Sequence, residues 1–206
     1  MLKFLFDLDG TLTKQETLPL IARHFRIEGE IASITAETVA GHIPFAESLR
    51  RRVGLLGQLP VTEVAALLEN VELHPLTIKF MQGHRQNCHV VTGNLSCWTQ
   101  LLLKKIGCPY HASVAQVKNN RVTKLRRILN KEKIVRHYMR TGHQVVFVGD
   151  GGNDAAAMRA ATVPIAAALT HTPAPATLAA AHFVAATDND LCNLLRNFER
   201  QLSLPQ

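Results

Sequence analysis

The sequence predicts an α/β fold: a Rossmann-like parallel sheet flanked by helices, with a small helical-bundle cap inserted after the first strand. Short apolar runs alternate with segments of helical periodicity, a pattern typical of buried parallel strands joined by crossover helices. The first two apolar runs are separated by far more chain than one crossover helix needs. Asp7 directly follows the first run and Asp150 stands two residues after the third, as expected where strands end at a ligand-binding edge.

Apolar runs and helical patterns define the expected elements. The expected strands are Leu2–Phe6, His89–Thr92, Val145–Val148, Val163–Ala166 and His182–Ala185. The expected core helices are Leu95–Ile106, Lys131–Met139, Ala155–Ala161, and Leu191–Phe198 with Asp190 as its N-cap. An antiparallel hairpin is expected over Ser113–Leu129, with its turn at Asn119 and Asn120.

The long stretch between Thr13 and Cys88 predicts a helical insertion. Breaks are expected at Gly29, at residues 41–44 and at Leu59-Pro60. The helices between these breaks are Glu16–Phe25, Ile31–Ala40, Phe45–Leu56 and Val61–Asn70. We therefore expect an α/β core domain of residues 1–13 and 76–206, and a helical cap domain of residues 14–75 that covers a site at the edge of the sheet.

The composition argues against several classes of protein. The net charge is +7 and the pI is about 9.5, but the basic residues are spread along the chain and only 5% of residues are aromatic. This favours solvated helix faces, or attraction of small anionic substrates, over a nucleic-acid-binding surface. No apolar stretch approaches the roughly 20 residues of a membrane helix, so we expect no membrane association.

The four cysteines have no CxxC spacing, which speaks against a zinc site. The N-terminus does not resemble a signal peptide, so free thiols and a cytoplasmic location are expected. The sequence leaves open whether the protein is a monomer or a homodimer.

Acidic residues gather at the ends of two expected strands. Asp7 and Asp9 follow the first strand, and side chains two residues apart share a face if the strand continues through them. Asp150 follows the third strand, with Asp154 one helical turn later. If these strands are neighbours, the carboxylates converge on one site. Their mutual repulsion requires a cation, and oxygen ligands of this kind favour Mg²⁺.

The second strand ends in groups that bind phosphate. Thr92 offers a hydroxyl and Gly93 a loop amide close to the N-terminus of a helix. Each of these motifs alone is weak, because DxD pairs and glycine-rich turns are common turn formers. Together and in this order they predict a site for a small phosphorylated metabolite.

These motifs resemble those of the haloacid dehalogenase-like phosphatases. The matching elements are DxDGT at Asp7–Thr11, (S/T)G at Thr92-Gly93, a lysine at Lys131 and GDxxND at Gly149–Asp154. The helical insertion is similar to the C1 cap of that superfamily. Within it the chain looks most like the phosphoserine phosphatases, through Glu16-Thr17 and the segment Ser48–Leu56.

The resemblance implies Mg²⁺-dependent phosphoryl transfer through an aspartyl-phosphate. Asp7 is the implied nucleophile, and Asp9 the general acid that later becomes a base. Thr92 and Lys131 are expected to stabilise the transferring group. The implied metal-binding residues are Asp7, Asp9 through its backbone carbonyl, Asp150 and Asp154. The implied substrate-binding residues are Glu16 for an ammonium group, Arg52 for a carboxylate, and Gly93, Asn94 and Asn153 near the phosphate.

Several of these residues have a second interpretation. Lys133 competes with Lys131 for the role of the phosphate-contacting lysine. Thr13 and Glu16 form a capping-box pattern, so Glu16 has a structural explanation beside the substrate role. Arg52 belongs to a triple arginine, which is typical of a solvated face. The ten histidines show no ligand spacing and are interpreted as ordinary surface or core residues.

Two positions depart from the phosphoserine phosphatase pattern. That family typically has serine where this chain has Gly10, and an SGG-type motif where this chain has Thr92-Gly93-Asn94. The departures preserve the chemistry, because threonine supplies the same hydroxyl, but they leave the substrate open.

Three functions follow from these residues. The first is a phosphoserine phosphatase of serine biosynthesis. The second is a phosphatase or phosphotransferase of the same subfamily that acts on another small phosphorylated metabolite. The third is a non-catalytic phospholigand-binding protein. The third is disfavoured, because a binding protein has no need of Asp7 and Asp9 together with Lys131 and Asp150.

Overall fold

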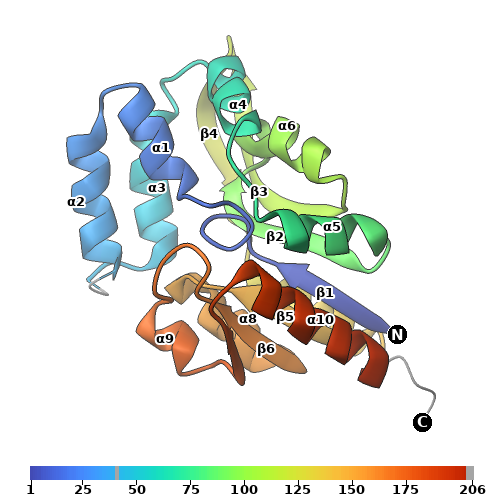
Figure 1. Cartoon of the computed structure of the whole chain (residues 1–206). Coiled ribbons are helices and arrows are strands. Elements are labelled where there is room, and N and C mark those ends of the chain that lie inside the picture. The colour runs from blue at the N-terminus through green and yellow to red at the C-terminus, as the bar shows by residue number, and fades with distance from the viewer. Residues whose placement is uncertain (40–41, 203–206) are drawn as a thin grey trace.

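The computed structural model describes residues 1–39 and 42–202. Within them the strands form a seven-stranded sheet in the order β4-β3-β2-β1-β5-β6-β7. The strands are β1 (Leu2–Phe6), β2 (Cys88–Leu95), β3 (Tyr110–Lys118), β4 (Arg121–Arg127), β5 (Gln144–Gly149), β6 (Val163–Ala167) and β7 (Phe183–Ala185). β1 pairs in parallel with both β2 and β5, and β4 is antiparallel to β3. The predicted α/β class with a mostly parallel sheet is confirmed (Figure 1).

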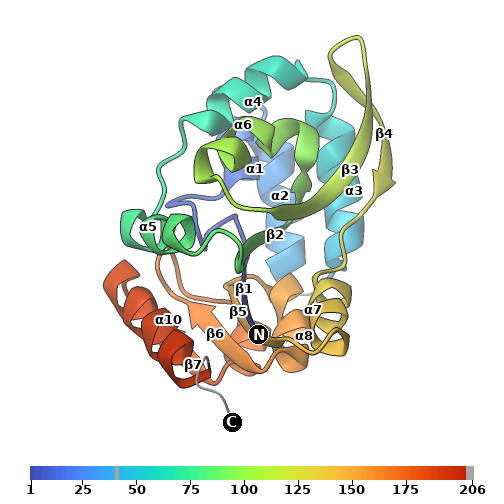
Figure 2. The ribbon, with the colours of Figure 1, turned by 90° about the vertical axis from the view of Figure 1, so that its right-hand side faces the viewer.

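Helices cover both faces of this sheet. The helices of the core are α5 (Pro75–Gly83), α6 (Ser96–Ile106), α7 (Lys131–Arg140), the 3₁₀ turn η1 (Gly152–Asp154), α8 (Ala155–Ala160), α9 (Pro175–Leu178) and α10 (Asp188–Leu202). Successive residues of β1 point to opposite faces: Phe4 and Phe6 pack with α5, α6 and α10, and Leu5 packs with α7 and α8. Figure 2 shows α10 on one side of the sheet and α7 and α8 on the other. Burial on both faces explains why the strands are continuous apolar runs.

Four helices are inserted between β1 and α5, as the sequence predicts. They are α1 (Thr17–His24), α2 (Glu28–Val39), α3 (Phe45–Leu56) and α4 (Val61–Glu69). Their apolar side chains form a second buried cluster that also includes Trp98 of α6 and Val122 of β4. The helical insertion therefore shares apolar packing with the core, and the exact limits of the two domains stay a prediction.

The predicted hairpin is formed by β3 and β4. Asn119 and Asn120 have positive φ angles of 51° and 60°, which suits a tight turn between antiparallel strands. The turn is tied to the helical insertion, because the Val61 amide donates to the Asn120 carbonyl at 2.8 Å and the Val122 amide donates to the Gly57 carbonyl at 3.0 Å. The hairpin therefore stands beside α3 and α4 (Figure 2).

The predicted start of the second inserted helix is wrong. Gly29 does not break the chain but lies exposed inside α2, where one glycine costs only about 1 kcal/mol. The turn before α2 instead uses Arg26, whose φ is 60°. The predicted end of this helix at Ala40, and the first residue of the predicted break, Gly41, lie outside the described residues.

Two predictions around α10 and α5 also need correction. Asp190 is not the N-cap of α10, because the helix begins at Asp188 and the Thr187 hydroxyl accepts the Asp190 amide at 3.1 Å. The sequence analysis missed α5. The Asp188 carboxylate accepts the amides of Leu76 and Thr77 at 2.8 and 2.9 Å, so it caps a helix more than 100 residues away in sequence. A cap supplied from so far along the chain leaves no local sequence pattern.

Among the helices of residues 1–39 and 42–202, none is long and apolar enough to span a bilayer.

Candidate active site

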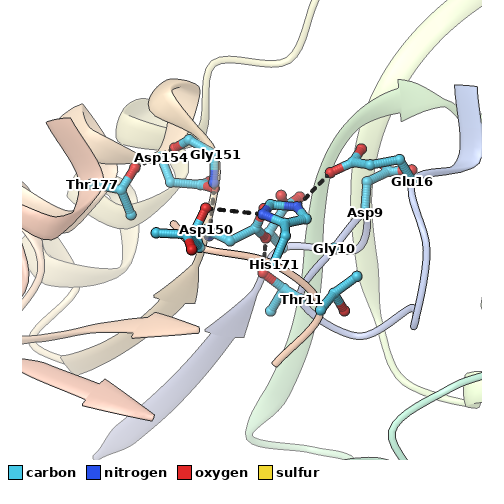
Figure 3. Close-up of polar contacts among 12 residues, drawn as sticks. Asp9, Gly10, Thr11, Glu16, Asp150, Gly151, Asp154, His171 and Thr177 are labelled. Atoms are coloured by element: carbon cyan, nitrogen blue, oxygen red, sulfur yellow. Dashed lines mark hydrogen bonds and ion pairs between the residues drawn. The ribbon is translucent and has the colours of Figure 1, made fainter. Parts of the chain in front are cut away.

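The two central strands bring the predicted carboxylates together. β1 and β5 are paired with Phe6 opposite Val148, and the Asp7 amide donates to the Val148 carbonyl at 2.9 Å. Asp7 and Asp150 therefore both leave the sheet at its carboxyl edge, where open α/β sheets bind ligands. Figure 3 shows this edge, with Asp150 and Asp154 facing the loop that follows β1. β1 ends at Phe6, so the strand argument for a shared face of Asp7 and Asp9 does not apply.

Asp7, Asp150 and Asp154 form a buried acidic cluster. One carboxylate oxygen of each lies within 4.8 Å of those of the other two. All three residues are buried, with 5%, 2% and 0% of their surfaces exposed. Closely spaced carboxylate oxygens are the ligands that Mg²⁺ prefers, so this cluster can hold a divalent ion.

Lys131 is the cation inside this cluster. Its Nζ lies 2.6 Å from Asp7 Oδ1 and 2.7 Å from Asp154 Oδ1. The lysine is placed by the start of α7, where Asn130 is the N-cap and accepts the Lys133 amide at 2.9 Å. The side chain of Lys133 is exposed. Of the two candidate lysines, Lys131 is therefore the one that reaches the site.

The cluster carries more negative charge than Lys131 balances. Burial, followed by the charge of Asp154, raises the pKa of Asp7 well above its ordinary value. The same two causes raise the pKa of Asp150 to about 7. Burial alone would lower the pKa of Lys131, but the carboxylates of Asp154 and Asp7 outweigh it and raise that pKa. The lysine is thus held as an ammonium ion. The excess of carboxylates calls for a further cation.

The GDGGND segment folds tightly around Asp154. Asp154 Oδ2 accepts the amides of Asp150 at 3.2 Å and of Gly151 at 3.0 Å. Gly149 permits this close approach, because a Cβ there would lie 2.5 Å from the Asp154 Cγ. The motif therefore uses glycine to let one carboxylate bind the backbone and Lys131 at the same time.

Asp9 lies among uncharged donors. Its carboxylate accepts hydrogen bonds from the Thr17 hydroxyl, from the Thr92 hydroxyl at 3.3 Å and from the Asn94 amide group at 3.4 Å. Burial, and then the nearby Glu16 carboxylate, raise its pKa, although the Thr17 hydrogen bonds oppose this. A carboxyl group in this setting is suited to hold a proton.

Glu16 does not close α1 as the capping-box pattern suggests. It occupies the N-cap position, but its side chain makes no cap hydrogen bond. The Thr13 hydroxyl instead donates to the Leu8 carbonyl at 3.1 Å and accepts the Gly10 amide at 3.1 Å. The structural explanation for Glu16 is therefore wrong, and its carboxylate faces the edge of the sheet (Figure 3).

Arg52 differs from its arginine neighbours on α3. Arg51 forms surface ion pairs with Glu47 and Glu37, as expected of a solvated face. Arg52 is half-buried, and its Nε donates to the Ser48 hydroxyl at 3.0 Å. Burial lowers the pKa of Arg52, and the negative charges of Glu16 and Asp9 oppose that effect. Arg52 therefore lies close enough to Glu16 and Asp9 for their charges to act on it.

Comparison with known proteins agrees with this geometry. Residues 4–162 match the family model of the haloacid dehalogenase-like hydrolases. The chain belongs to this family of hydrolases.

The hydrolase is similar to phosphoserine phosphatases in sequence. It is 32% identical to the phosphoserine phosphatase of Methanocaldococcus jannaschii over 79% of this chain and 83% of that protein. It is also 32% identical to a phosphoserine phosphatase of Mycobacterium tuberculosis, over 78% of this chain and 42% of that longer protein. The chain therefore spans less than half of the second relative.

Solved structures give the same result. A substrate-bound phosphoserine phosphatase complex matches the hydrolase with a TM-score of 0.78 at 28% identity, over 96% of this chain and 98% of that one. A phospho-aspartyl intermediate analogue of phosphoserine phosphatase matches with a TM-score of 0.76 at 28% identity, over 96% and 99%. The resemblance drawn from the motifs is confirmed, and the helical insertion agrees with the cap of these structures.

The remaining residues predicted to bind the substrate of the hydrolase are Asn94, Gly93 and Asn153, and each has a different environment. Asn94 is buried and donates to the Thr17 hydroxyl at 2.7 Å, so it braces the residues around Asp9. Gly93 lies under Phe45 of α3, whose Cζ would be 2.5 Å from a Cβ at this position. Asn153 lines a cavity of about 610 Å³ beside Lys131.

Two residues of the candidate site have no signal in the sequence. Phe45 covers Gly93 from the helical insertion, and its place at the start of an amphipathic helix gave no signal of that contact. The sequence offers His171 only as an ordinary histidine, and the structure adds that its Nε2 lies 3.0 Å from Glu16 Oε1 and 3.3 Å from Asp150 Oδ2. The hydrogen bond to Glu16 raises the pKa of His171 to about 9. Its loop carries no motif, so only the fold reveals this position.

Proposed function

We propose that this hydrolase is a Mg²⁺-dependent phosphoserine phosphatase that acts through an aspartyl-phosphate. One arrangement supports the proposal most directly: the charges of Glu16 and Asp9 act on Arg52, and a Glu16 carboxylate oxygen lies within 4.8 Å of one of Asp150. A carboxylate and a guanidinium beside a phosphate-binding site match the ammonium and carboxylate groups of phosphoserine. The substrate-bound phosphoserine phosphatase noted above supports a small phosphorylated metabolite as ligand.

The acidic cluster fits the metal that this proposal requires. Asp7, Asp150 and Asp154 supply buried oxygen donors within 4.8 Å of one another, and Lys131 is the cation that pairs with two of these three carboxylates. These residues, with the backbone carbonyl of Asp9, would hold Mg²⁺. When bound, the ion would offset the charge of the phosphate so that two anions can meet.

The first half-reaction transfers the phosphoryl group to the protein. An Asp7 carboxylate oxygen attacks phosphorus, and the bond from phosphorus to the serine oxygen breaks. Asp9 gives its proton to that departing oxygen, so serine leaves as a neutral alcohol. Lys131 and Thr92 would bind the phosphoryl oxygens, because this chemistry depends mainly on positioning and charge.

The second half-reaction returns the protein to its starting state. Asp9, now a carboxylate, takes a proton from a water molecule as that water attacks phosphorus. The bond from phosphorus to the Asp7 oxygen breaks, inorganic phosphate leaves, and Asp7 is again a carboxylate. Both protonation states of Asp9 are used in turn, which suits its surroundings of neutral donors.

A panel of phosphomonoesters tests the substrate. The purified protein with Mg²⁺ is offered O-phospho-L-serine, the same molecule without its amino group, sugar phosphates and p-nitrophenyl phosphate. We expect the highest kcat/KM for O-phospho-L-serine. A clear preference for another phosphomonoester would refute the assignment to phosphoserine and leave the reaction type intact.

The role of Arg52 is tested against its neighbour. Arg52→Ala should raise KM for O-phospho-L-serine about ten-fold, as expected for loss of a charge-assisted hydrogen bond. KM for p-nitrophenyl phosphate, which has no carboxylate, should change far less. Arg51→Ala is the matched control, because Arg51 pairs with surface acids. Equal increases for both substrates would reduce Arg52 to a structural residue.

The cavity beside Lys131 favours a second candidate, a larger phosphomonoester with another anionic group. About 610 Å³ in volume, the cavity is lined by Arg50, Arg126 and Arg127 as well as Lys131. This volume exceeds the needs of serine alone, and its arginines suit an anion. The same panel, extended by sugar bisphosphates, decides between the candidates, because the bisphosphates would then be preferred.

The absence of disulfide bonds among the four cysteines supports the cytoplasmic location that the sequence predicts. All four cysteines are free, and Cys88, Cys108 and Cys192 are buried. Free thiols of this kind are typical of a reducing compartment.

A further inference from the structure

His171 joins two acidic residues at the edge of the sheet. The residue lies in the loop between β6 and α9, while Glu16 precedes α1 and Asp150 follows β5. Figure 3 shows the imidazole between the two carboxylates, with Nε2 3.0 Å from Glu16 Oε1 and 3.3 Å from Asp150 Oδ2. Three segments far apart in the sequence thus place one nitrogen and two oxygen donors together.

The three donor atoms border the space beside Gly10. A Cβ built on Gly10 would lie 2.7 Å from Asp150 Oδ2, 2.8 Å from His171 Nε2 and 2.9 Å from Glu16 Oε1. The three donor atoms therefore lie around the space that a side chain at position 10 would fill. Gly10, with a φ of 76°, leaves this space open, and any side chain at that position would crowd it.

The donor set is that of a borderline divalent ion. An imidazole nitrogen with two carboxylate oxygens suits Zn²⁺ and related ions, whereas an all-oxygen set suits Mg²⁺. Bonds of about 2.0–2.2 Å to one ion place its ligand atoms roughly 3–3.6 Å apart. The distances of 3.0 and 3.3 Å from His171 Nε2 fall in that range. The neighbouring cluster of Asp7, Asp150 and Asp154 offers oxygen alone.

We propose that Glu16, Asp150 and His171 form a second divalent-ion site, selective for Zn²⁺-like ions, and that its occupation inhibits the enzyme. The ion replaces the hydrogen that His171 Nε2 shares with the two carboxylates. Inhibition follows because Asp150 is withdrawn from the Mg²⁺ cluster and Glu16 from the substrate. The inhibitory part rests on the proposed function, but ion binding does not.

Calorimetric titration of the full chain with Zn²⁺ tests the site without any substrate. His171→Ala and Glu16→Gln should each weaken one class of Zn²⁺ binding at least about ten-fold, because each removes a ligand. Mg²⁺ affinity should change less than about two-fold in both variants, since neither residue belongs to the Mg²⁺ cluster. His182→Ala, at an exposed histidine beside β7, is the matched control and should bind both ions like the wild type.

Inhibition is measured with p-nitrophenyl phosphate at saturating Mg²⁺. Zn²⁺ should inhibit the wild type and His182→Ala at concentrations about ten-fold lower than those needed for His171→Ala. Unchanged Zn²⁺ affinity in both His171→Ala and Glu16→Gln would overturn the second site. A wild type that binds Zn²⁺ through these residues but hydrolyses no phosphomonoester would support the site and overturn the proposed function alone.

Discussion

Asp7 and Asp9 stand two residues apart, yet the chain surrounds them differently. Asp7 faces the ammonium group of Lys131 at 2.6 Å. Asp9 accepts hydrogen bonds from the uncharged side chains of Thr17, Thr92 and Asn94. Burial raises the pKa of both carboxyl groups. The difference lies in the direct partners of each carboxylate: an ammonium group contacts Asp7, while the hydrogen-bond donors of Asp9 are uncharged.

One short loop can therefore supply both a nucleophile and a general acid. A nucleophile must be ionised, so it belongs beside cations. A general acid must hold a proton until the leaving group needs it, so it belongs among neutral donors. Lys131 alone is insufficient for Asp7, since it also binds Asp154 at 2.7 Å. Both residues are aspartates, so the difference between their roles comes from the side chains around them, which belong to distant parts of the chain.

The largest expected effect comes from Asp7→Asn, which removes the proposed nucleophile. We expect kcat to fall at least about 1000-fold with O-phospho-L-serine and p-nitrophenyl phosphate alike, because no covalent intermediate can form. Binding of inorganic phosphate with Mg²⁺, measured by calorimetry, should persist. Appreciable turnover in this variant would remove Asp7 from the role of nucleophile.

Lys131→Met removes the ammonium group that contacts Asp7 and Asp154. Two buried carboxylates then lose their shared partner, which should lower the stability of the metal-free protein by about 3 kcal/mol. Saturating Mg²⁺ should reduce this loss. Thermal unfolding with EDTA and with Mg²⁺ measures both effects. Lys133→Met, at the exposed lysine of the same helix, is the control, and an equal loss there would contradict the special position of Lys131.

Asp9→Asn removes the proposed proton donor and tests its role separately from that of Asp7. The first step should slow about 100-fold with O-phospho-L-serine, whose leaving alkoxide needs a proton. With p-nitrophenyl phosphate the first step should change little, because p-nitrophenolate leaves unprotonated. The second step still lacks its base, so stopped-flow absorbance should show a burst of p-nitrophenolate followed by slow turnover. The same loss in the first step for both substrates would argue against the acid role.

The smallest expected effect concerns pH. The pKa of Asp150 is about 7 in the folded protein, against an ordinary value of 3.8. Because the folded state binds this proton more tightly than the unfolded state, metal-free stability should fall as pH rises from about 4 to 7. Each kcal/mol corresponds to about 2–4 °C in Tm for a chain of this size.

Mg²⁺ should reverse that trend, since it binds the ionised carboxylate and gains affinity over the same pH range. Thermal unfolding at pH 5 and pH 8, with EDTA and with Mg²⁺, measures both slopes. In Asp150→Asn the metal-free slope should be smaller. A metal-free Tm that rises from pH 5 to pH 8 would be inconsistent with a raised pKa for Asp150.

The sequence predicts the sheet, the helical insertion and the meeting of Asp7 with Asp150. These depend on strong local signals: continuous apolar runs, helical periodicity and acidic residues directly after strands. The order of motifs then identifies the family. Lys131 could be selected only as one of two lysines, and burial in the fold separates it from Lys133.

The missed features depend on contacts between distant segments. His171 reaches Glu16 and Asp150 from a loop without a motif, and Asp188 caps α5 across the chain. Gly29 was given too much weight, because packing and neighbouring residues outweigh the low helix propensity of one glycine. Local patterns carry no information about such partners, so these predictions fail for the same reason.

The position of β1 has a consequence for how the protein is made. β1 is synthesised before its two partners in the sheet, which begin at Cys88 and Gln144. The nascent chain must therefore keep a very hydrophobic segment unpaired while most of the molecule is translated. Leu2–Phe6 can bind a chaperone during that interval, and the acidic cluster can form only after Asp150 and Asp154, which follow β5, have left the ribosome.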